Sequence, residues 1–171
     1  MSTLLWINRT FEFSLPAEMF PMVVERLRGT PARLEEIVRS ASPEILTQRH
    51  DNHWSIAETV GHLGDVEILW DLRMDDFLAG KKELFAADMS NRHTKEADHN
   101  SAPIEELLGR FRNARMALVA RLDALEEHQI EITALHPRLK KPMRIIDSSF
   151  FAAEHDDHHL AALTGLIRGP A

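Results

Sequence analysis

Histidine is the residue type with the clearest chemical potential in this chain, which has ten histidines and no cysteine among 171 residues. His155 and His159 are four residues apart, so on a helix they lie about 40° apart and both imidazoles can reach one ion. Both continue an apolar stripe that contains Ala152 and Leu163. Buried imidazoles need hydrogen-bond or metal partners. The pair therefore predicts a metal site on the inner face of a helix.

A third histidine, His62, lies in a second apolar segment that is predicted to be a buried helix. Three neutral imidazoles from two facing helices can hold a divalent ion and leave a coordination position open to water. Such an ion lowers the pKa of a bound water or thiol to about 7, which supplies a nucleophile. We therefore expect His62, His155 and His159 to bind one metal ion. His158 competes with His159, but it aligns less well with the stripe and is placed outside the ligand set.

Two carboxylates, Asp65 and Glu67, follow His62 on the same segment. Either could orient a ligating imidazole by accepting a hydrogen bond from it. Glu67 interrupts an apolar stripe and is a candidate catalytic residue, as a general base that accepts a proton. It is equally compatible with a salt bridge to an arginine such as Arg115. The three histidines are also compatible with a metal-free core in which protein groups satisfy the imidazoles.

Several other residues are expected to lie outside the site. His136 precedes a proline and is expected to be a turn residue rather than a pocket residue. Trp54 and Trp70 fit helical spacing and are expected in the core, whereas the acidic pair at 156–157 is expected on a solvated face. Five histidines in polar contexts are expected to be solvent-exposed: His50, His53, His93, His99 and His128.

Helices must position these residues, because the sequence has almost no alternating strand pattern. Ser55 and Glu58 read as a capping box at the start of one helix. Gly29 is expected to end a first segment, and Thr30-Pro31 to begin the next. The expected fold is all-α, a four-helix bundle in a single domain over 1–171. We expect four long antiparallel helices near residues 30–41, 54–79, 103–127 and 145–168, with an additional helix over 16–28.

Composition excludes several classes of function. The chain has 20 Lys and Arg against 27 Asp and Glu, a formal charge of −7, so we expect no nucleic-acid partner and no anionic membrane surface. The absence of cysteine excludes disulfides, thiolate nucleophiles and cysteine-ligated zinc. No apolar run approaches the roughly 18 residues of a membrane span, and no signal-peptide pattern is present. A soluble cytoplasmic protein is the expectation.

Four short motifs occur in a characteristic order: His-Trp-Ser at 53–55, Gly-His-Leu at 61–63 with Glu67, His-Pro at 136–137, and the His-rich run at 154–159. Together they resemble the motifs of the DinB/YfiT-like superfamily, over nearly the whole chain. The resemblance implies a four-helix bundle with down-up-up-down connectivity, often dimeric, which holds nickel, zinc or a similar ion through three histidines. Carried over residue by residue, these are His62, His155 and His159.

The resemblance also implies two kinds of chemistry, because relatives with known activity include thiol-dependent S-transferases and a thiol-using maleylpyruvate isomerase. One hypothesis is a metal-dependent S-transferase or hydrolase that acts on a small electrophilic substrate, with Glu67 as the proton acceptor. A thiol would then come from a low-molecular-weight cosubstrate, since the chain has no cysteine. The alternative is a non-catalytic metal-binding stress-response protein or a dimeric scaffold. The broad apolar surface of the helix over 54–79 favours a homodimer in either case.

Overall fold

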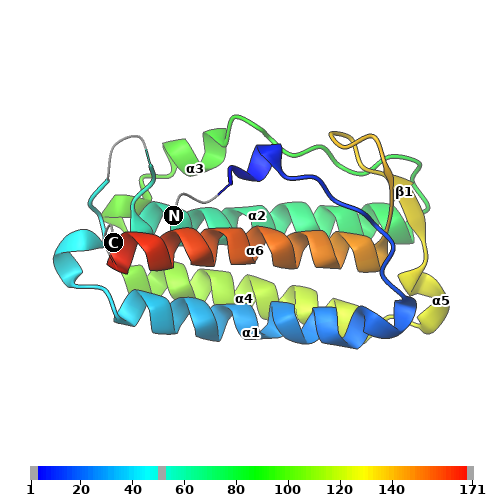
Figure 1. Ribbon diagram of the computed structural model, residues 1–171, viewed down its shortest axis with the longest axis horizontal. Helices are drawn as coiled ribbons and strands as arrows, with labels where there is room; N and C mark the ends of the chain where they lie inside the picture. The colour runs from blue at the N-terminus through cyan, green and yellow to red at the C-terminus, as the bar shows by residue number, and fades with distance from the viewer. Residues whose placement is uncertain (1–3, 50–52, 169–171) are drawn as a thin grey trace.

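The computed structural model describes residues 4–49 and 53–168. Four long helices form its body: α1 (Phe20–Arg39), α2 (Ile56–Leu78), α4 (Ile104–Asp123) and α6 (Ile145–Arg168). The all-α four-helix bundle expected from the sequence is confirmed (Figure 1). Among the described residues, no helix is both long enough and apolar enough to cross a membrane. His50, expected at the surface, lies outside the described residues.

The four helices follow the down-up-up-down order that the family resemblance implies. In Figure 1, α1 and α6 run one way along the bundle, whereas α2 and α4 run the other way. α2 packs against α4, and α6 packs against α1, so both of these neighbouring pairs are parallel. The expectation of four antiparallel helices is therefore wrong. A long connection between α2 and α4 carries the chain back to the end where α2 began, which is what makes those two helices parallel.

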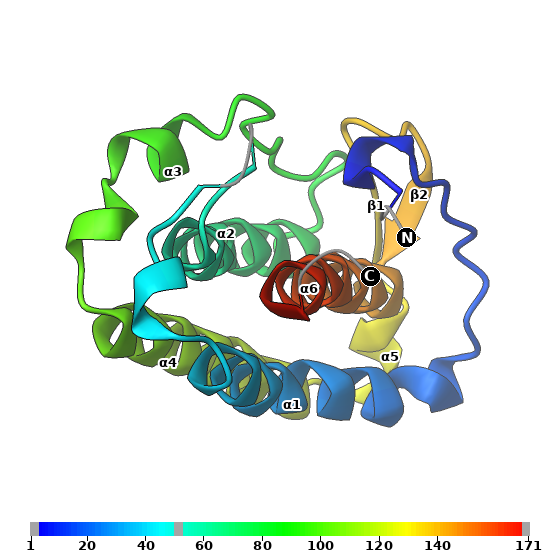
Figure 2. The same ribbon diagram turned by 60° about the vertical axis from the view of Figure 1, so that its left-hand side comes forward.

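This long return connection and the N-terminal segment lie on the same side of the bundle, over α2 and α6 (Figures 1 and 2). The connection contains the short helix α3 (Arg92–Glu96) and the 3-10 turn η4 (His99–Ser101), and both contact α2. The N-terminal segment contains the 3-10 turns η1 (Trp6–Asn8) and η2 (Ala17–Met19). Two segments far apart in the sequence therefore cover the face where α2 meets α6.

The remaining elements are short. η3 (Pro43–Ile45) lies between α1 and α2, and α5 (Glu127–Ile130) follows α4. A two-stranded antiparallel hairpin precedes α6, with β1 (Thr133–Leu135) paired to β2 (Pro142–Arg144) so that Ala134 lies opposite Met143. The hairpin is attached to the return connection by a hydrogen bond from the Leu84 N–H to the Leu135 carbonyl oxygen, of 3.0 Å.

α1 is one continuous helix, where the sequence predicted two separated at Gly29. Pro31 lies inside it, and a proline lacks the N–H that would bond to the carbonyl four residues earlier, here that of Leu27. A neighbouring helix supplies a donor instead, because Nη1 of Arg115 lies 3.5 Å from the Leu27 carbonyl oxygen. The local pattern could not predict this, since the compensating group is 88 residues away in the sequence.

α2 begins as predicted. The Ser55 hydroxyl accepts a hydrogen bond from the Glu58 N–H at 3.1 Å, and the Glu58 carboxylate accepts one from the Ser55 N–H at 2.9 Å. This reciprocal pair satisfies two of the amide groups that a helix leaves unpaired at its start. The capping box is thus confirmed, and it fixes the register of the helix that carries His62.

The bundle has two apolar clusters, one on each side of a buried polar layer. One cluster includes Leu27, Trp70 and Phe151, and the other includes Leu34, Val60 and Leu160. Near the level at which each helix passes from one cluster to the other, it carries buried polar side chains. These side chains are Thr30, His62, Glu67, Arg115, His155 and Asp156.

Candidate metal centre and cavity

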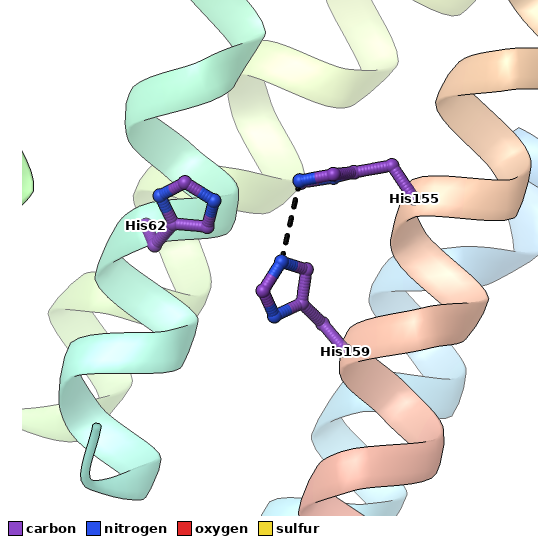
Figure 3. Close-up of side chains that lie close together, drawn as sticks. All are labelled: His62, His155 and His159. Carbon is purple, nitrogen blue, oxygen red and sulfur yellow. Dashed lines mark hydrogen bonds between the residues drawn. The ribbon is translucent and has the colours of Figure 1, made fainter. Parts of the chain in front are cut away.

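Three histidines from two helices converge in the polar layer (Figure 3). His62 comes from α2, and His155 and His159 come from successive turns of α6. One nitrogen from each ring lies within 4.8 Å of the other two, and the Nε2 atoms of His155 and His159 are 3.2 Å apart. Two ligands at about 2.0–2.1 Å from one ion in tetrahedral geometry are about 3.4 Å apart. The donor set and its spacing therefore fit a divalent ion, and His158 is not part of the group.

The hydrogen bonds of His62 determine which of its nitrogens can bind a metal. The Thr94 hydroxyl donates to Oδ2 of Asp65 at 2.9 Å, so its oxygen accepts from Nδ1–H of His62 at 3.2 Å. With the proton on Nδ1, the lone pair of His62 is on Nε2. Asp65 thus orients the imidazole through Thr94, as one of the two carboxylates considered for this role.

Asp65 accepts hydrogen bonds from two side chains of the return connection. Besides Thr94, its Oδ2 accepts a hydrogen bond from Nε2–H of His99 at 2.9 Å. His99 was expected at the surface but is 2% exposed, because it packs directly over Gly61. A Cβ atom at position 61 would overlap the His99 ring. The glycine before His62 therefore makes room for a histidine of the return connection, and His62, Asp65, Thr94 and His99 form one connected group.

The electrostatic setting keeps the three rings neutral. Burial lowers the pKa of His62 to about 4 and lowers the pKa values of His155 and His159 well below their ordinary value. Neighbouring imidazoles lower those of His155 and His159 further, since each charged ring would repel the others. Neutral imidazole is the form that binds a metal ion. The site therefore holds its ligands in the binding form at neutral pH.

Glu67 lies deeper in the polar layer and is paired with Arg115. The Arg115 guanidinium donates to the Glu67 carboxylate from Nε at 3.0 Å and from Nη2 at 2.5 Å. It also donates to Asp156, whose carboxylate accepts from the Thr30 hydroxyl at 2.9 Å. The sequence left two roles open for Glu67, a general base and a salt bridge to Arg115. The structure contains the salt bridge. The network joins α2, α4, α6 and α1, and Asp156 directly follows the ligand candidate His155 on α6.

Asp156 also corrects an expectation, because it is fully buried rather than part of a solvated face. Its side chain is at 0% exposure and shares Arg115 with Glu67. The neighbouring Asp157 is partly exposed and pairs with Arg26 and Arg33 of α1. The local sequence could not assign Asp156 to the interior, because the residue that pairs with it there, Arg115, lies on another helix.

A cavity of about 650 Å³ opens beside the three histidines. Its walls come from α2, α6, the return connection, the turn after β1 and η1. Trp54 lies 4.6 Å from His62 and stacks nearly parallel to His159, while Trp6 meets His155 edge-on at 5.2 Å between ring centroids. The metal centre therefore opens onto an aromatic-lined cavity.

Several cavity residues were placed elsewhere by the sequence analysis. Trp54 and Trp70 line the cavity, and Trp70 is also part of an apolar cluster, as expected. His136 makes a turn, since its Nδ1 accepts from the backbone N–H groups of Arg138 and Leu139 at 3.2 and 3.1 Å. Its ring is nevertheless 2% exposed and also lines the cavity. Its place in the His-Pro motif was the one sequence signal for this. Three other histidines are exposed as expected: His53, His93 and His128.

Within the described residues, three buried side-chain nitrogens have no hydrogen-bond partner: Nε1 of Trp70, Nε2 of His136 and Nδ1 of His155. All three residues line this one cavity. Buried polar groups without partners are uncommon in folded proteins. Because all three lie at one cavity, we infer that polar atoms of a ligand or of solvent in the cavity form hydrogen bonds with them.

Comparisons with solved structures agree with this architecture. YfiT from Bacillus subtilis, described as a probable metal-dependent hydrolase with an unusual four-helix bundle topology, superposes with a TM-score of 0.83. The match has 20% sequence identity and covers 94% of this chain and 92% of that chain. The colibactin self-resistance protein ClbS, solved in complex with double-stranded DNA, matches with a TM-score of 0.67 and 16% identity over 92% of this chain and 100% of that one. At these identities the likeness establishes the fold.

The family is established by sequence. A comparison with curated proteins finds no match. The family model of the DinB superfamily, however, matches residues 26–163, a range that includes all three histidines of the centre and the residues that position them. The chain belongs to the DinB superfamily.

Proposed function

We propose that this protein is a metal-dependent enzyme of thiol-dependent S-transferase or hydrolase type, acting on a small electrophilic substrate. The observation that carries the proposal is a cluster of three neutral histidines that opens onto a cavity of about 650 Å³. A divalent ion held there, nickel or zinc, would act as a Lewis acid and lower the pKa of a bound water or thiol. Because the chain has no cysteine, the thiol would be a low-molecular-weight cosubstrate.

The chain's own residues have distinct tasks in this proposal. His62, His155 and His159 hold the ion, and Asp65 orients His62 through Thr94. Trp6 and Trp54 flank the histidines and limit the access of water to them. Glu67 holds Arg115, which in turn holds Asp156 beside His155, so we assign Glu67 a positioning role within this network.

The cavity favours the enzyme over a purely structural metal site. A structural site is closed by four protein ligands, whereas a catalytic site keeps a position for substrate. Within the described residues, the cluster contains three histidines, and no further His, Asp or Glu belongs to the group. We propose no nucleic-acid role, although ClbS was solved with DNA, because a formal charge of −7 opposes binding of a polyanion.

Elemental analysis and a thiol screen test the proposal together. We expect about one divalent ion per chain in the purified protein, and thiol- or water-dependent turnover of a model electrophile. His155→Ala and His159→Ala should abolish stoichiometric metal binding, whereas His158→Ala, the matched control one residue away, should largely preserve it. Metal retained in a variant with His62, His155 and His159 all changed to alanine would overturn the site. A metal-loaded protein that is inactive with every thiol and electrophile would favour the non-catalytic alternative.

A further inference from the structure

Among the described residues, Arg73 is a buried cation that forms no ion pair with a carboxylate. Its side chain is 2% exposed, and its one hydrogen bond in the described residues is from Nε to the Phe85 carbonyl oxygen, at 3.0 Å. The other deeply buried arginine, Arg115, has two carboxylates. Asp76, three residues further along the helix, attracts Arg73 electrostatically, but its carboxylate is already engaged by the Phe85 N–H and the Lys81 ammonium, each at 2.6 Å. Burying an unpaired guanidinium costs free energy, so this position calls for an anion.

Two more donors lie at the same end of the cavity. The Nδ1 atom of His136 accepts two backbone N–H groups, so its proton is on Nε2, and that buried N–H has no partner in the described part of the chain. Arg138 lines the cavity and, among the described residues, forms no ion pair. Burial, followed by the charges of Arg73 and Arg138, lowers the pKa of His136 to about 3. Backbone contacts also bring these groups together, since Arg73 donates to the Phe85 carbonyl oxygen and the adjacent Leu84 N–H donates to the carbonyl oxygen of Leu135, the residue before His136.

This basic end shares the cavity with the metal centre. His62 and Arg73 are eleven residues apart on α2, which places them on the same face about three turns, or roughly 16 Å, apart along the axis. Trp70 lies between them, with its ring centroid 5.4 Å from Cζ of Arg73 and 5.9 Å from the His155 ring. Phe151 continues this aromatic surface to His136, at 5.3 Å between ring centroids. A ligand lying on these rings could therefore reach both ends.

Much of the rest of the cavity lining is apolar and partly open to solvent, and the polar side chains that also line it are Asp65, Asp88, Asn91, His93 and Thr94. Five of the nine exposed large hydrophobic side chains among the described residues line this cavity. They come from η1, α2 and the return connection, and they are Ile7, Ile68, Leu72, Phe85 and Met89. Exposed apolar side chains that gather at one cavity indicate a ligand with apolar surface to cover.

We propose that Arg73, His136 and Arg138 form a subsite for an anionic group, a carboxylate or a phosphate, on a substrate whose body is aromatic or aliphatic. The anionic group accepts hydrogen bonds from the two guanidinium groups and from Nε2–H of His136, while Trp70, Phe151 and the apolar lining cover the body. The reactive end of the substrate then faces the three histidines. The inference rests on the proposed function only in naming the ligand a substrate, since binding at this subsite requires neither metal nor turnover.

Two fluorescent probes with the same ring system test the subsite in the full-length protein as purified. Anilinonaphthalene sulfonate carries an anionic group, and phenylnaphthylamine lacks it. We expect Arg138→Gln to weaken binding of the anionic probe about tenfold or more, the usual effect of losing a charge-assisted hydrogen bond, and to change the neutral probe less than twofold. Arg138→Lys should restore part of the loss. Arg92→Gln removes an equal charge from an exposed position on α3 and is the matched control.

Competition then identifies the anion. Octanoate and octyl phosphate should displace the anionic probe more effectively than octanol, and the stronger competitor indicates whether a carboxylate or a phosphate is preferred. Equal weakening of both probes by Arg138→Gln, no weakening of either, or the same loss in Arg92→Gln would overturn the subsite. If probe selectivity persists in protein that binds no metal, the proposed function fails and the subsite stands. If the protein binds stoichiometric metal but shows no anion selectivity, the subsite fails and the metal centre stands.

Discussion

At the scale of single residues, Glu67 decides how the polar layer and the candidate metal centre are connected. Its carboxylate is 3% exposed and shares the Arg115 guanidinium with Asp156. Burial raises the pKa of Glu67 to about 7, while Arg115 opposes that rise. A carboxylate in this position holds a buried cation in place. Removal of one partner from a buried pair leaves the other without compensation, which is costly.

We therefore expect Glu67→Gln to lower the free energy of unfolding by about 2 kcal/mol or more, measured by denaturant titration. Metal content should be retained, because Glu67 is not part of the histidine group. Glu36→Gln on the exposed face of α1 is the control and should change stability little. Full stability combined with a loss of turnover of a hundredfold or more would instead assign Glu67 the role of proton acceptor.

The histidine cluster could be predicted from the sequence, whereas the groups around it could not. The four-residue spacing of His155 and His159 on an apolar stripe fixes their common direction, and His62 lies on a helix with a recognisable capping box. Thr94 and His99 gave no comparable signal, because they lie in an irregular connection whose path over α2 depends on the whole fold. His136 was ambiguous, since a turn residue and a buried cavity residue share the same local sequence.

At the scale of elements, long helices were predicted well and their interruptions poorly. α2, α4 and α6 begin within two residues of their expected starts, because caps and apolar periodicity are local properties. α1 runs through Gly29 and Pro31, because packing against α4 and α6 supplies contacts that the local pattern does not contain. Helix direction was also beyond the local pattern, since it depends on how the 25-residue connection between Leu78 and Ile104 returns.

Gly61 connects α2 to this return connection and provides a sharp test. A Cβ atom there would displace the His99 ring, which bonds to Asp65, and Asp65 orients His62 through Thr94. We expect Gly61→Ala to weaken metal binding about 10- to 100-fold, as measured by competition with a chelator, because orienting partners typically contribute this much.

Gly64→Ala is the matched control for that experiment. Gly64 lies on the same helix, and a Cβ atom there would meet Phe111 at an ordinary distance of 3.9 Å. Alanine is favoured over glycine inside a helix by about 1 kcal/mol, so Gly64→Ala should keep metal affinity and gain a little stability. Equal affinities in the two variants would show that His99 does not position the ligand.

At the scale of the whole molecule, the parallel arrangement of α2 and α4 accounts for the cavity. Parallel neighbours require a long return connection, and this connection passes over α2 (Figure 2), where its Thr94 contacts His62. The N-terminal segment covers the same face, so η1, the return connection and the turn after β1 enclose one space together with α2 and α6. The homodimer remains a prediction, and sedimentation at micromolar concentration tests it.

The buried histidines make the stability of the whole molecule sensitive to acid. Burial lowers the pKa of His62 to about 4 and that of His136 to about 3, from an ordinary value of 6.5. Between those folded-state values and 6.5 the unfolded chain binds more protons than the folded one, so the free energy of unfolding falls as pH falls. Each such histidine contributes about 1.4 kcal/mol per pH unit in this window. The raised pKa of Glu67 has the opposite effect: between pH 4.5 and about pH 7 it makes the free energy of unfolding rise as pH falls. This is one group, whereas several histidines have lowered pKa values.

We therefore expect denaturant midpoints measured on metal-free protein to fall steadily from pH 6.5 towards pH 4. His136→Gln should reduce the slope by about one proton, because glutamine does not titrate while its amide can still accept a hydrogen bond from the turn. His128→Gln changes an exposed histidine and is the control. A slope that is flat in the wild type, or unchanged by His136→Gln, would mean that water or structural adjustment stabilises the charged imidazole, and that the cavity is more polar than its aromatic lining indicates.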